Sequence, residues 1–305
     1  MNNLIHAKCP VCSNSNSSKF KHIGRPELSP KAKTVFKETY QVLKCQNCRF
    51  YFVSPQNLTD VEMSKLYDET YFTEMTKWWA KKRDRDRKNR LDKLQECLNQ
   101  KRIRFLDIGC GEGYVLIEAA DRGWEVHGID VFDNRMQLVK RQEVKFFKGE
   151  IKNAHFPDNH FDCIYMDSVL EHLFDPVDYL RELFRITKVG GLIYCVVPNE
   201  DSLFNDIKRL LYALSGKGNI SERIQPFISP YHVSGFTKKS LSEAALQSGF
   251  EVVTMRTFGG QYEILQFRAF TKPFLTNLFL LPIHLMAILM RKQLYLEVIL
   301  RKNQL

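Results

Sequence analysis

Residues 105–113 constrain the fold of this chain more than any other segment. They read FLDIGCGEG, an apolar run that enters a glycine-rich turn, and HGID follows at residues 127–130. Glycine tolerates positive φ and the close approach of a ligand, and residues 114–121 predict a helix whose N-terminus faces the turn. Tyr114 stands where the dinucleotide fingerprint G-x-G-x-x-G needs its third glycine, which argues against hydride transfer with a nicotinamide cofactor.

Acidic residues flank this turn on both sides. Asp107 lies just before it, where a carboxylate would repel a pyrophosphate and suits a cationic ligand such as the amino-acid end of S-adenosylmethionine. Asp130 lies about 20 residues beyond the turn, where an acidic side chain can accept hydrogen bonds from both ribose hydroxyls. The glycines and the two carboxylates together predict a nucleoside cofactor site rather than an ordinary strand, turn and helix.

Short apolar runs rich in β-branched and aromatic residues recur along the chain, separated by helical patterns. Residues 144–147, 161–166 and 192–197 predict strands that are covered on both faces of a parallel sheet. Apolar spacing predicts a helix over residues 176–187, and the glycine pair 190–191 predicts the turn that leaves it. These patterns indicate an α/β fold with a doubly wound sheet.

The same alternation continues toward the C-terminus. Thr237 is the predicted N-cap of a helix over residues 238–248, and Gly249 follows just past the end of that helix. Residues 251–258 then predict a sixth strand.

Four motifs, taken in order, resemble those of class I S-adenosylmethionine-dependent methyltransferases. After the glycine turn come KGEI at residues 148–151, FPDNHFDCIYMDSVLEHLFDP at 156–176 and KVGGLIYCVVPN at 188–199. The resemblance covers residues 100–260. It implies a Rossmann-like, seven-stranded, doubly wound sheet with strand order 3-2-1-4-5-7-6, whose last, antiparallel strand falls at residues 295–302.

The resemblance also implies roles for particular residues. Glu150 would meet the adenine amino group, and Asp167 would touch the methionine end of the cofactor. The full set of candidate cofactor residues is Asp107, Gly109, Cys110, Gly111, Gly113, Asp130, Val131, Glu150, Ile151 and Asp167.

Two C-x-x-C pairs stand near the N-terminus. Cys9 with Cys12 and Cys45 with Cys48 supply four thiolates, enough for one tetrahedral structural zinc. Disulfides are the alternative. No signal peptide precedes the first pair and the other four cysteines are single, so we expect zinc in a cytoplasmic protein.

Residues 45–72 resemble the segment that joins a zinc ribbon to a methyltransferase domain in a broad bacterial family. Members are often associated with methylation of cell-surface polysaccharides, deoxysugars or natural products. Arg49 departs from that pattern, because those relatives usually carry glycine after the fourth cysteine. We expect a zinc-ribbon-like module at 1–56, a helical linker or lid at 57–99 and the methyltransferase domain at 100–305.

A charged run at residues 78–94 follows the ribbon. Aspartates interrupt its positive charge, which favours a solvated helix in front of the cofactor domain over a nucleic-acid-binding arm. The chain carries 45 Lys and Arg against 35 Asp and Glu, a net charge of +10. That excess is compatible with RNA, anionic lipid or phosphorylated substrates and selects none of them.

Residues 274–290, within an apolar insertion at 270–292, break the ordinary globular pattern. The stretch is shorter than a membrane span and contains Pro282 and His284, which argues against spanning. Two interpretations stay open, and the first is favoured: a buried or lid-forming insertion, or an interfacial segment in peripheral contact with an anionic membrane.

Methyl transfer to a hydroxyl needs a base, and histidine suits that role near neutral pH. The resemblance places His172 toward the acceptor after the fourth strand, and His232 opens the other side after the fifth. Either residue could instead cap a helix or fill a packing position. Similar ubiquinone-type enzymes hold a divalent ion near this Glu-His pair, for which Glu171 is the one acidic match. Residues 200–235 predict a helix and a glycine-containing loop suited to an acceptor lid.

The leading hypothesis is an S-adenosylmethionine-dependent methyltransferase that acts on oxygen of a small-molecule or cell-surface glycan acceptor. The zinc ribbon would then be a scaffold or acceptor-side wall. The alternatives are an RNA base methyltransferase that recognises RNA through the zinc module, and a cofactor-binding regulator without catalysis.

Overall fold

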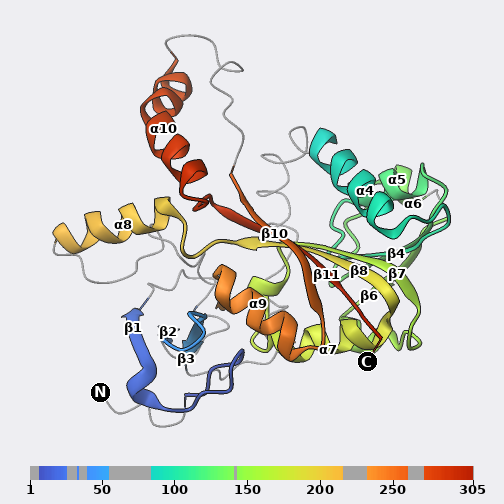
Figure 1. The fold of residues 1–305 in the computed structure, drawn as a ribbon. Coiled ribbons are helices and arrows are strands. Elements are labelled where there is room, and N and C mark those ends of the chain that lie inside the picture. The colour runs from blue at the N-terminus through green and yellow to red at the C-terminus, as the bar shows by residue number, and fades with distance from the viewer. Residues whose placement is uncertain are drawn as a thin grey trace.

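The computed structural model describes residues 7–25, 33, 40–54, 84–140, 143–215, 232–259 and 271–304. Within these residues a seven-stranded sheet forms the centre of the molecule (Figure 1). In spatial order its strands are β10 (Glu251–Phe258), β11 (Tyr295–Arg301), β8 (Thr187–Pro198), β7 (Phe161–Asp167), β4 (Arg104–Ile108), β5 (Glu125–Asp130) and β6 (Lys145–Lys148).

The order of this sheet confirms the predicted topology. Numbered along the chain and read from the β6 edge, its strands follow 3-2-1-4-5-7-6. β11 runs antiparallel to both of its neighbours, whereas β6, β5, β4, β7 and β8 pair in parallel. The carboxyl ends of the parallel strands therefore meet at one edge, where α/β sheets bind their ligands.

Helices cover both faces of the sheet. One face carries α4 (Asp84–Leu98), α5 (Tyr114–Ala120) and α6 (Gln137–Lys140); the other carries α7 (Pro176–Ile186) and α9 (Lys238–Gln247). Alternate strand residues separate the two cores: Phe105 packs on the α4 side and Leu106 on the α7 side. This alternation explains why the strands read as continuous apolar runs.

The predicted boundaries of α9 and β10 agree with the structure. Thr237 accepts a hydrogen bond from the Ser240 amide at 3.2 Å and forms a capping box. The glycine pair 190–191, by contrast, is not the exit turn of α7. The helix ends at Ile186, and the glycines form an irregularity inside β8, where Gly190 has φ of 78°. Strand pairing with β7 continues across them, so the strand is longer than its apolar run.

The N-terminal residues build a second, four-stranded antiparallel sheet. It contains β1 (Phe20–Gly24), which follows η1 (Ser17–Lys19), and then β2 (Gln41–Cys45), β3 (Tyr51–Ser54) and β9 (Ser234–Gly235). Its fourth strand comes from the segment just before α9. Phe50 packs edge-on against Phe236, at 5.1 Å between ring centroids, and the two sheets share one hydrophobic core.

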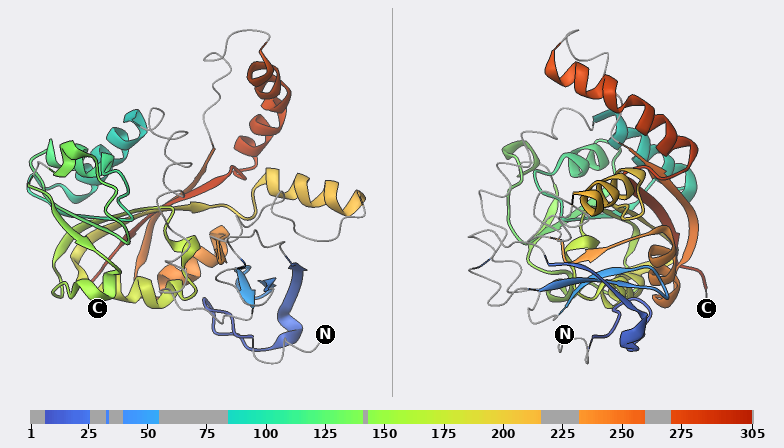
Figure 2. Two further views of the ribbon diagram at one scale, coloured as in Figure 1. Left: turned by 180° about the vertical axis from the view of Figure 1, so that it is seen from behind. Right: turned by 90° about the vertical axis from the view of Figure 1, so that its left-hand side faces the viewer.

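Two helices extend beyond the body. α8 (Leu203–Leu214) follows β8, and α10 (Lys272–Leu289) lies between β10 and β11; both project away from the sheet in Figures 1 and 2. Phe279 and Leu289 of α10 are 79% and 82% exposed, so the interpretation of this insertion as buried is wrong. A lid role for residues 200–235 stays a prediction, and residues 216–231 lie outside the described part, as do 57–83 of the linker.

Among the described residues, no helix combines the length and hydropathy of a membrane span. The run at 78–94 forms α4 from Asp84 onward, and Arg90, Leu91 and Leu94 are buried against the sheet. The helix therefore packs on the domain as expected, but one of its faces is far from solvent.

Candidate functional site

The glycine turn, residues 109–113, joins β4 to α5 at the carboxyl edge of the sheet. Gly109, Gly111 and Gly113 all have positive φ, from 51° to 84°. A Cβ on Gly109 would lie 2.8 Å from Val169 Cγ2, and one on Gly113 would lie 2.9 Å from Val139 Cγ2. A Cβ on Gly111 would meet no atom within 4 Å, so this glycine borders open space. The turn therefore packs at its two ends and is open at its middle.

Three carboxylates, called here the carboxylate cluster, surround this opening: Asp107, Asp130 and Asp167. The Gly111 amide donates a hydrogen bond to Asp130 Oδ2 at 2.8 Å, which ties the second strand to the turn. Burial, and then the charges of Asp130 and Asp167, raise the pKa of Asp107 well above its ordinary value. Burial also raises the pKa of Asp130. Such a site favours a ligand that brings positive charge.

Arg90 of α4 supplies a cation to this cluster. Its Nη1 donates to Asp167 Oδ2 and to the Tyr165 hydroxyl, both at 2.8 Å. Arg90 was not among the predicted site residues, because the charged run at residues 78–94 is typical of a solvated helix. The helical spacing of Arg87, Leu91 and Leu94 was the available signal, since it marks one buried face of α4.

The other candidate cofactor residues lie at the same edge, with one exception. The Gly149 amide donates a hydrogen bond to Asp130 O at 2.8 Å, which places Glu150 and the buried Ile151 beside the end of β5. Val131, the residue after β5, lies at the same place. Cys110 belongs to the turn, but its Sγ packs inward against Gly128, where burial raises the pKa of the thiol. Any contribution of Cys110 to a ligand would come from its backbone.

The two candidate histidines are brought together. The rings of His172 and His232, called here the histidine pair, meet edge-on with centroids 5.0 Å apart. Glu171 lies beside them, and one ligand atom from each of the three residues falls within 4.8 Å of the others. Two imidazoles and a carboxylate can move a proton and could also hold a divalent cation.

Burial controls the protonation of this group. Desolvation, and then the charge of His172, hold the pKa of His232 well below its usual range, so its ring is neutral near pH 7. Desolvation is also the main cause that raises the pKa of Glu171 to about 8. Glu171 is 2% exposed, and its Oε2 has no hydrogen-bond partner among the described residues. A buried, unsatisfied carboxyl oxygen is costly and is typical of functional sites.

The N-terminal sheet holds the histidine pair in place. The Val53 amide of β3 donates to Val233 O at 3.2 Å, and the Val233 amide donates to Glu171 O at 2.9 Å. Ser234 Oγ donates to Leu173 O at 2.5 Å. The segment that carries His232 is thus held between the N-terminal sheet and the loop after β7.

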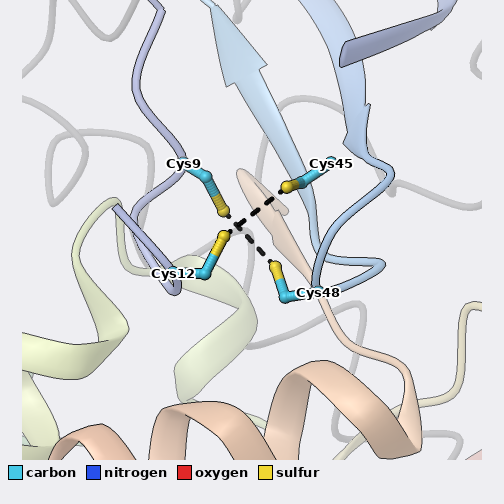
Figure 3. Close-up of side chains that lie close together, drawn as sticks. All are labelled: Cys9, Cys12, Cys45 and Cys48. Carbon is cyan, nitrogen blue, oxygen red and sulfur yellow. Dashed lines mark hydrogen bonds between the residues drawn. The ribbon is translucent and has the colours of Figure 1, made fainter. Parts of the chain in front are cut away.

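The four N-terminal cysteines converge from two similar turns (Figure 3). In each turn the first cysteine O accepts a hydrogen bond from the residue after the second cysteine: Ser13 donates to Cys9 O and Arg49 donates to Cys45 O. Arg49 has φ of 66°, in the left-handed region that favours glycine.

Sulfur positions in this cluster suit one metal ion. The Sγ atoms of Cys9 and Cys48 are 3.5 Å apart, and those of Cys12 and Cys45 are 3.6 Å apart. A tetrahedral zinc with bonds of about 2.3 Å places its sulfurs about 3.8 Å apart. All four ligand atoms lie within 4.8 Å of one another. Four thiolates this close would repel one another without a cation between them, so the residues fit zinc.

Comparison with known proteins agrees with this architecture. A family model described as a methyltransferase domain matches residues 80–255. A demethylmenaquinone methyltransferase of a Geobacillus species is 31% identical over 133 residues, which is 40% of this chain and 56% of the relative. An uncharacterized methyltransferase of Schizosaccharomyces pombe is 35% identical over 112 residues, 32% of this chain and 40% of the relative. The chain thus spans about half the length of the curated relatives it matches.

The fold also matches a solved structure. A SAM-dependent methyltransferase from Archaeoglobus fulgidus aligns with a TM-score of 0.52 and 20% sequence identity, over 76% of this chain and 99% of that one. At this identity the match concerns the fold alone.

Proposed function

Because this chain belongs to the methyltransferase-domain family, we propose that it transfers the methyl group of S-adenosylmethionine to an oxygen of a small-molecule or glycan acceptor. The observation that carries the proposal is the position of the histidine pair. His172 follows the strand that contributes Asp167, His232 packs against its ring, and Val169 of the same segment as His172 packs on the glycine turn. A base and a cofactor cradle therefore meet at one edge of the sheet.

The residues of the cradle fit the cofactor. The open side of Gly111 leaves room for a ligand beside the backbone, and Asp130 lies next to it for the ribose hydroxyls. Burial and neighbouring carboxylates disfavour the charge of Asp107, and bound sulfonium and ammonium groups would offset that cost. Bound S-adenosylmethionine would supply a methyl group already activated by its sulfonium. The protein must then orient the acceptor, exclude water and remove a proton.

We assign the proton transfer to the histidine pair. His172 is half-buried, and its ring would accept the proton that the acceptor hydroxyl loses as its oxygen bonds to the methyl carbon and the bond from that carbon to the sulfur breaks. His232 is buried and neutral, and it orients the ring of His172 by edge-on packing. The carboxyl of Glu171 completes the polar group.

A small acceptor is favoured over a macromolecule by the kind of relatives found. The Geobacillus relative is named for demethylmenaquinone, a small molecule. The N-terminal sheet contributes a wall beside the histidine pair, which supports its role on the acceptor side. We further propose that Cys9, Cys12, Cys45 and Cys48 bind one structural zinc.

The test is the transfer of radiolabelled methyl from S-adenosylmethionine into an extract of the source cell, fractionated into RNA, lipid-linked glycan, nucleotide-sugar, small-molecule and protein pools. Label in a glycan, nucleotide-sugar or small-molecule fraction supports the proposal. Asp130→Ala should abolish it, and the exposed variant Val189→Ser serves as a matched control. Label that ribonuclease destroys would replace this function by RNA methylation. No transfer into any pool, with the cofactor bound, would indicate a regulator.

A further inference from the structure

Exposed apolar side chains are concentrated on the two projecting helices. Of the 13 large apolar side chains that lie exposed in the described part of the chain, 11 belong to α8 or to α10 and its C-cap; the exceptions are Val189 and Leu246. The 11 residues are Leu210, Leu211, Leu214, Leu275, Leu278, Phe279, Leu285, Met286, Ile288, Leu289 and Met290. We call α8 and α10 with Met290 the apolar helix pair. A patch of this kind on a monomer marks an interaction site.

The exposed residues of α10 form a stripe. Leu275, Leu278, Phe279, Leu285 and Leu289 recur at helical spacing, so they share one face of the helix. The opposite face turns toward the protein, where Ala287 is buried. An apolar face of α10 therefore points into solvent, the reverse of an ordinary surface helix.

The two helices form one unit attached to the site edge of the sheet. The rings of Phe204 and His284 pack against each other at a tilt, with centroids 4.6 Å apart, and Lys292 Nζ donates a hydrogen bond to Asp206 Oδ2 at 2.8 Å. Tyr295 at the start of β11 pairs with Pro198 at the end of β8. Both helices thus leave from the carboxyl edge, where the glycine turn and the histidine pair lie, and Figure 2 shows them standing clear of the sheet.

The charge around the apolar helix pair is positive. From residue 203 to 214 and from 272 to 292 the chain carries Lys208, Arg209, Lys272, Arg291 and Lys292. The single acid in these segments is Asp206, which Lys292 neutralises. A second copy of this chain would bring the same positive rim to the interface and be repelled, whereas anionic lipid headgroups would be attracted.

We propose that the apolar helix pair docks on the surface of an anionic membrane. The exposed stripe of α10 inserts among the headgroups and upper acyl chains, and the flanking lysines and arginines contact the phosphates. No described helix is able to span the bilayer, so the contact is peripheral. Resting on the proposed function, this docking holds the histidine pair near the bilayer surface and points to an acceptor with a lipid anchor.

Flotation of the full chain with liposomes tests the docking without requiring catalysis. The protein should float with vesicles of phosphatidylcholine and phosphatidylglycerol, and high salt should weaken binding. The double variant Phe279→Ser/Leu289→Ser should reduce the bound fraction at least tenfold, because it removes two of the most exposed apolar side chains. Val189→Ser/Leu246→Ser is the matched control, with two exposed apolar residues changed elsewhere, and should bind as the parent does.

Three outcomes would overturn the proposal. The parent protein stays with the soluble fraction on anionic vesicles; the helix variant floats as well as the control; or light scattering shows a dimer that the helix variant converts to a monomer, which would assign the surface to a second copy. Equal melting temperatures of the two variants exclude a folding defect. Flotation without methyl transfer to any acceptor would contradict the proposed function and leave the docking intact.

Discussion

In the proposed cofactor site, we expect single side chains to affect both the binding of the cofactor and the stability of the empty protein. Asp107 is buried beside two further carboxylates, and its pKa is raised because the folded state disfavours its charge. Buried carboxyl groups whose pKa is raised in this way are found where a ligand of opposite charge binds. The residues that would recognise a cationic cofactor are thus the same residues whose burial destabilises the empty protein.

Asp107→Asn should separate these two effects. The amide carries no charge, so the empty variant should melt about 2–4 °C above the parent, while S-adenosylmethionine binding weakens at least tenfold. Differential scanning fluorimetry gives the first quantity and isothermal titration calorimetry the second. Asp121→Asn, on the exposed end of α5, is the control that should change neither. Cofactor affinity equal to that of the parent would contradict the assigned role of Asp107.

Glu171 predicts a dependence of stability on pH. Its pKa of about 8 in the folded state exceeds its ordinary 4.5, so between these values the folded state keeps a proton that the unfolded chain releases. This contribution to stability is complete below the ordinary pKa and is lost as pH rises through about 8. Glu171→Gln removes it. The difference in melting temperature between the variant and the parent should therefore increase from about pH 5 to about pH 9. If the melting temperatures of the two proteins change with pH in parallel, the carboxyl is in contact with solvent.

Elements that are distant in sequence depend on each other at the site. β3 lies next to the second cysteine turn and pairs with β9, which directly follows His232. Lys239 Nζ donates to Asn47 O at 2.6 Å, so the same turn also contacts α9. The cysteine turns therefore support the segment that carries His232 through strand pairing, and they contact α9 through a direct hydrogen bond.

Replacement of Cys9 and Cys48 by serine should show this dependence. Metal analysis of the parent should give about one zinc per chain, and the variant should lose it. Because β3 then loses its support, methyl transfer should fall at least tenfold while cofactor affinity changes little. Cys97→Ser changes a half-buried cysteine outside the cluster and should retain both metal and activity. Zinc content unchanged by the double substitution would exclude these ligands.

At the scale of the whole molecule, the N-terminal module and the large domain share one core. Cys9, Phe50 and Phe52 belong to the same buried cluster as Leu106 and Ile164 of the central sheet. Two regions that share a core unfold together rather than in sequence. The N-terminal sheet also takes β9 from the far side of residue 56, so the two sheets share residues of both regions as well as one core, and a domain boundary near residue 56 stays a prediction.

Calorimetry should accordingly detect a single thermal transition for the full chain. A metal chelator should shift that transition to lower temperature without splitting it, because loss of the module exposes core residues of the large domain. Two transitions, with a chelator affecting the lower one alone, would indicate a module that folds independently.

The sequence could predict what depends on near neighbours along the chain. Gly109, Gly111 and Gly113 determine a turn, because strand, turn and helix are continuous and local sterics decide their geometry. Asp107 and Asp130 beside it predict a class of ligand. The capped start of α9 and the extent of β10 were predictable for the same reason. The paired C-x-x-C turns likewise carry their own geometry, and the order of the large sheet was available from the resemblance.

Tertiary structure decided what depends on contacts between distant segments. It buried Arg90 of a highly charged helix against Asp167, and it left an apolar helix outside the core, because packing partners rather than composition determine burial. It also placed His232 against His172, 60 positions away in the numbering (232 − 172 = 60), through strands contributed by the N-terminus. Local residue patterns thus determined the glycine turn and its flanking carboxylates, whereas long-range strand pairing and packing brought the histidine pair together.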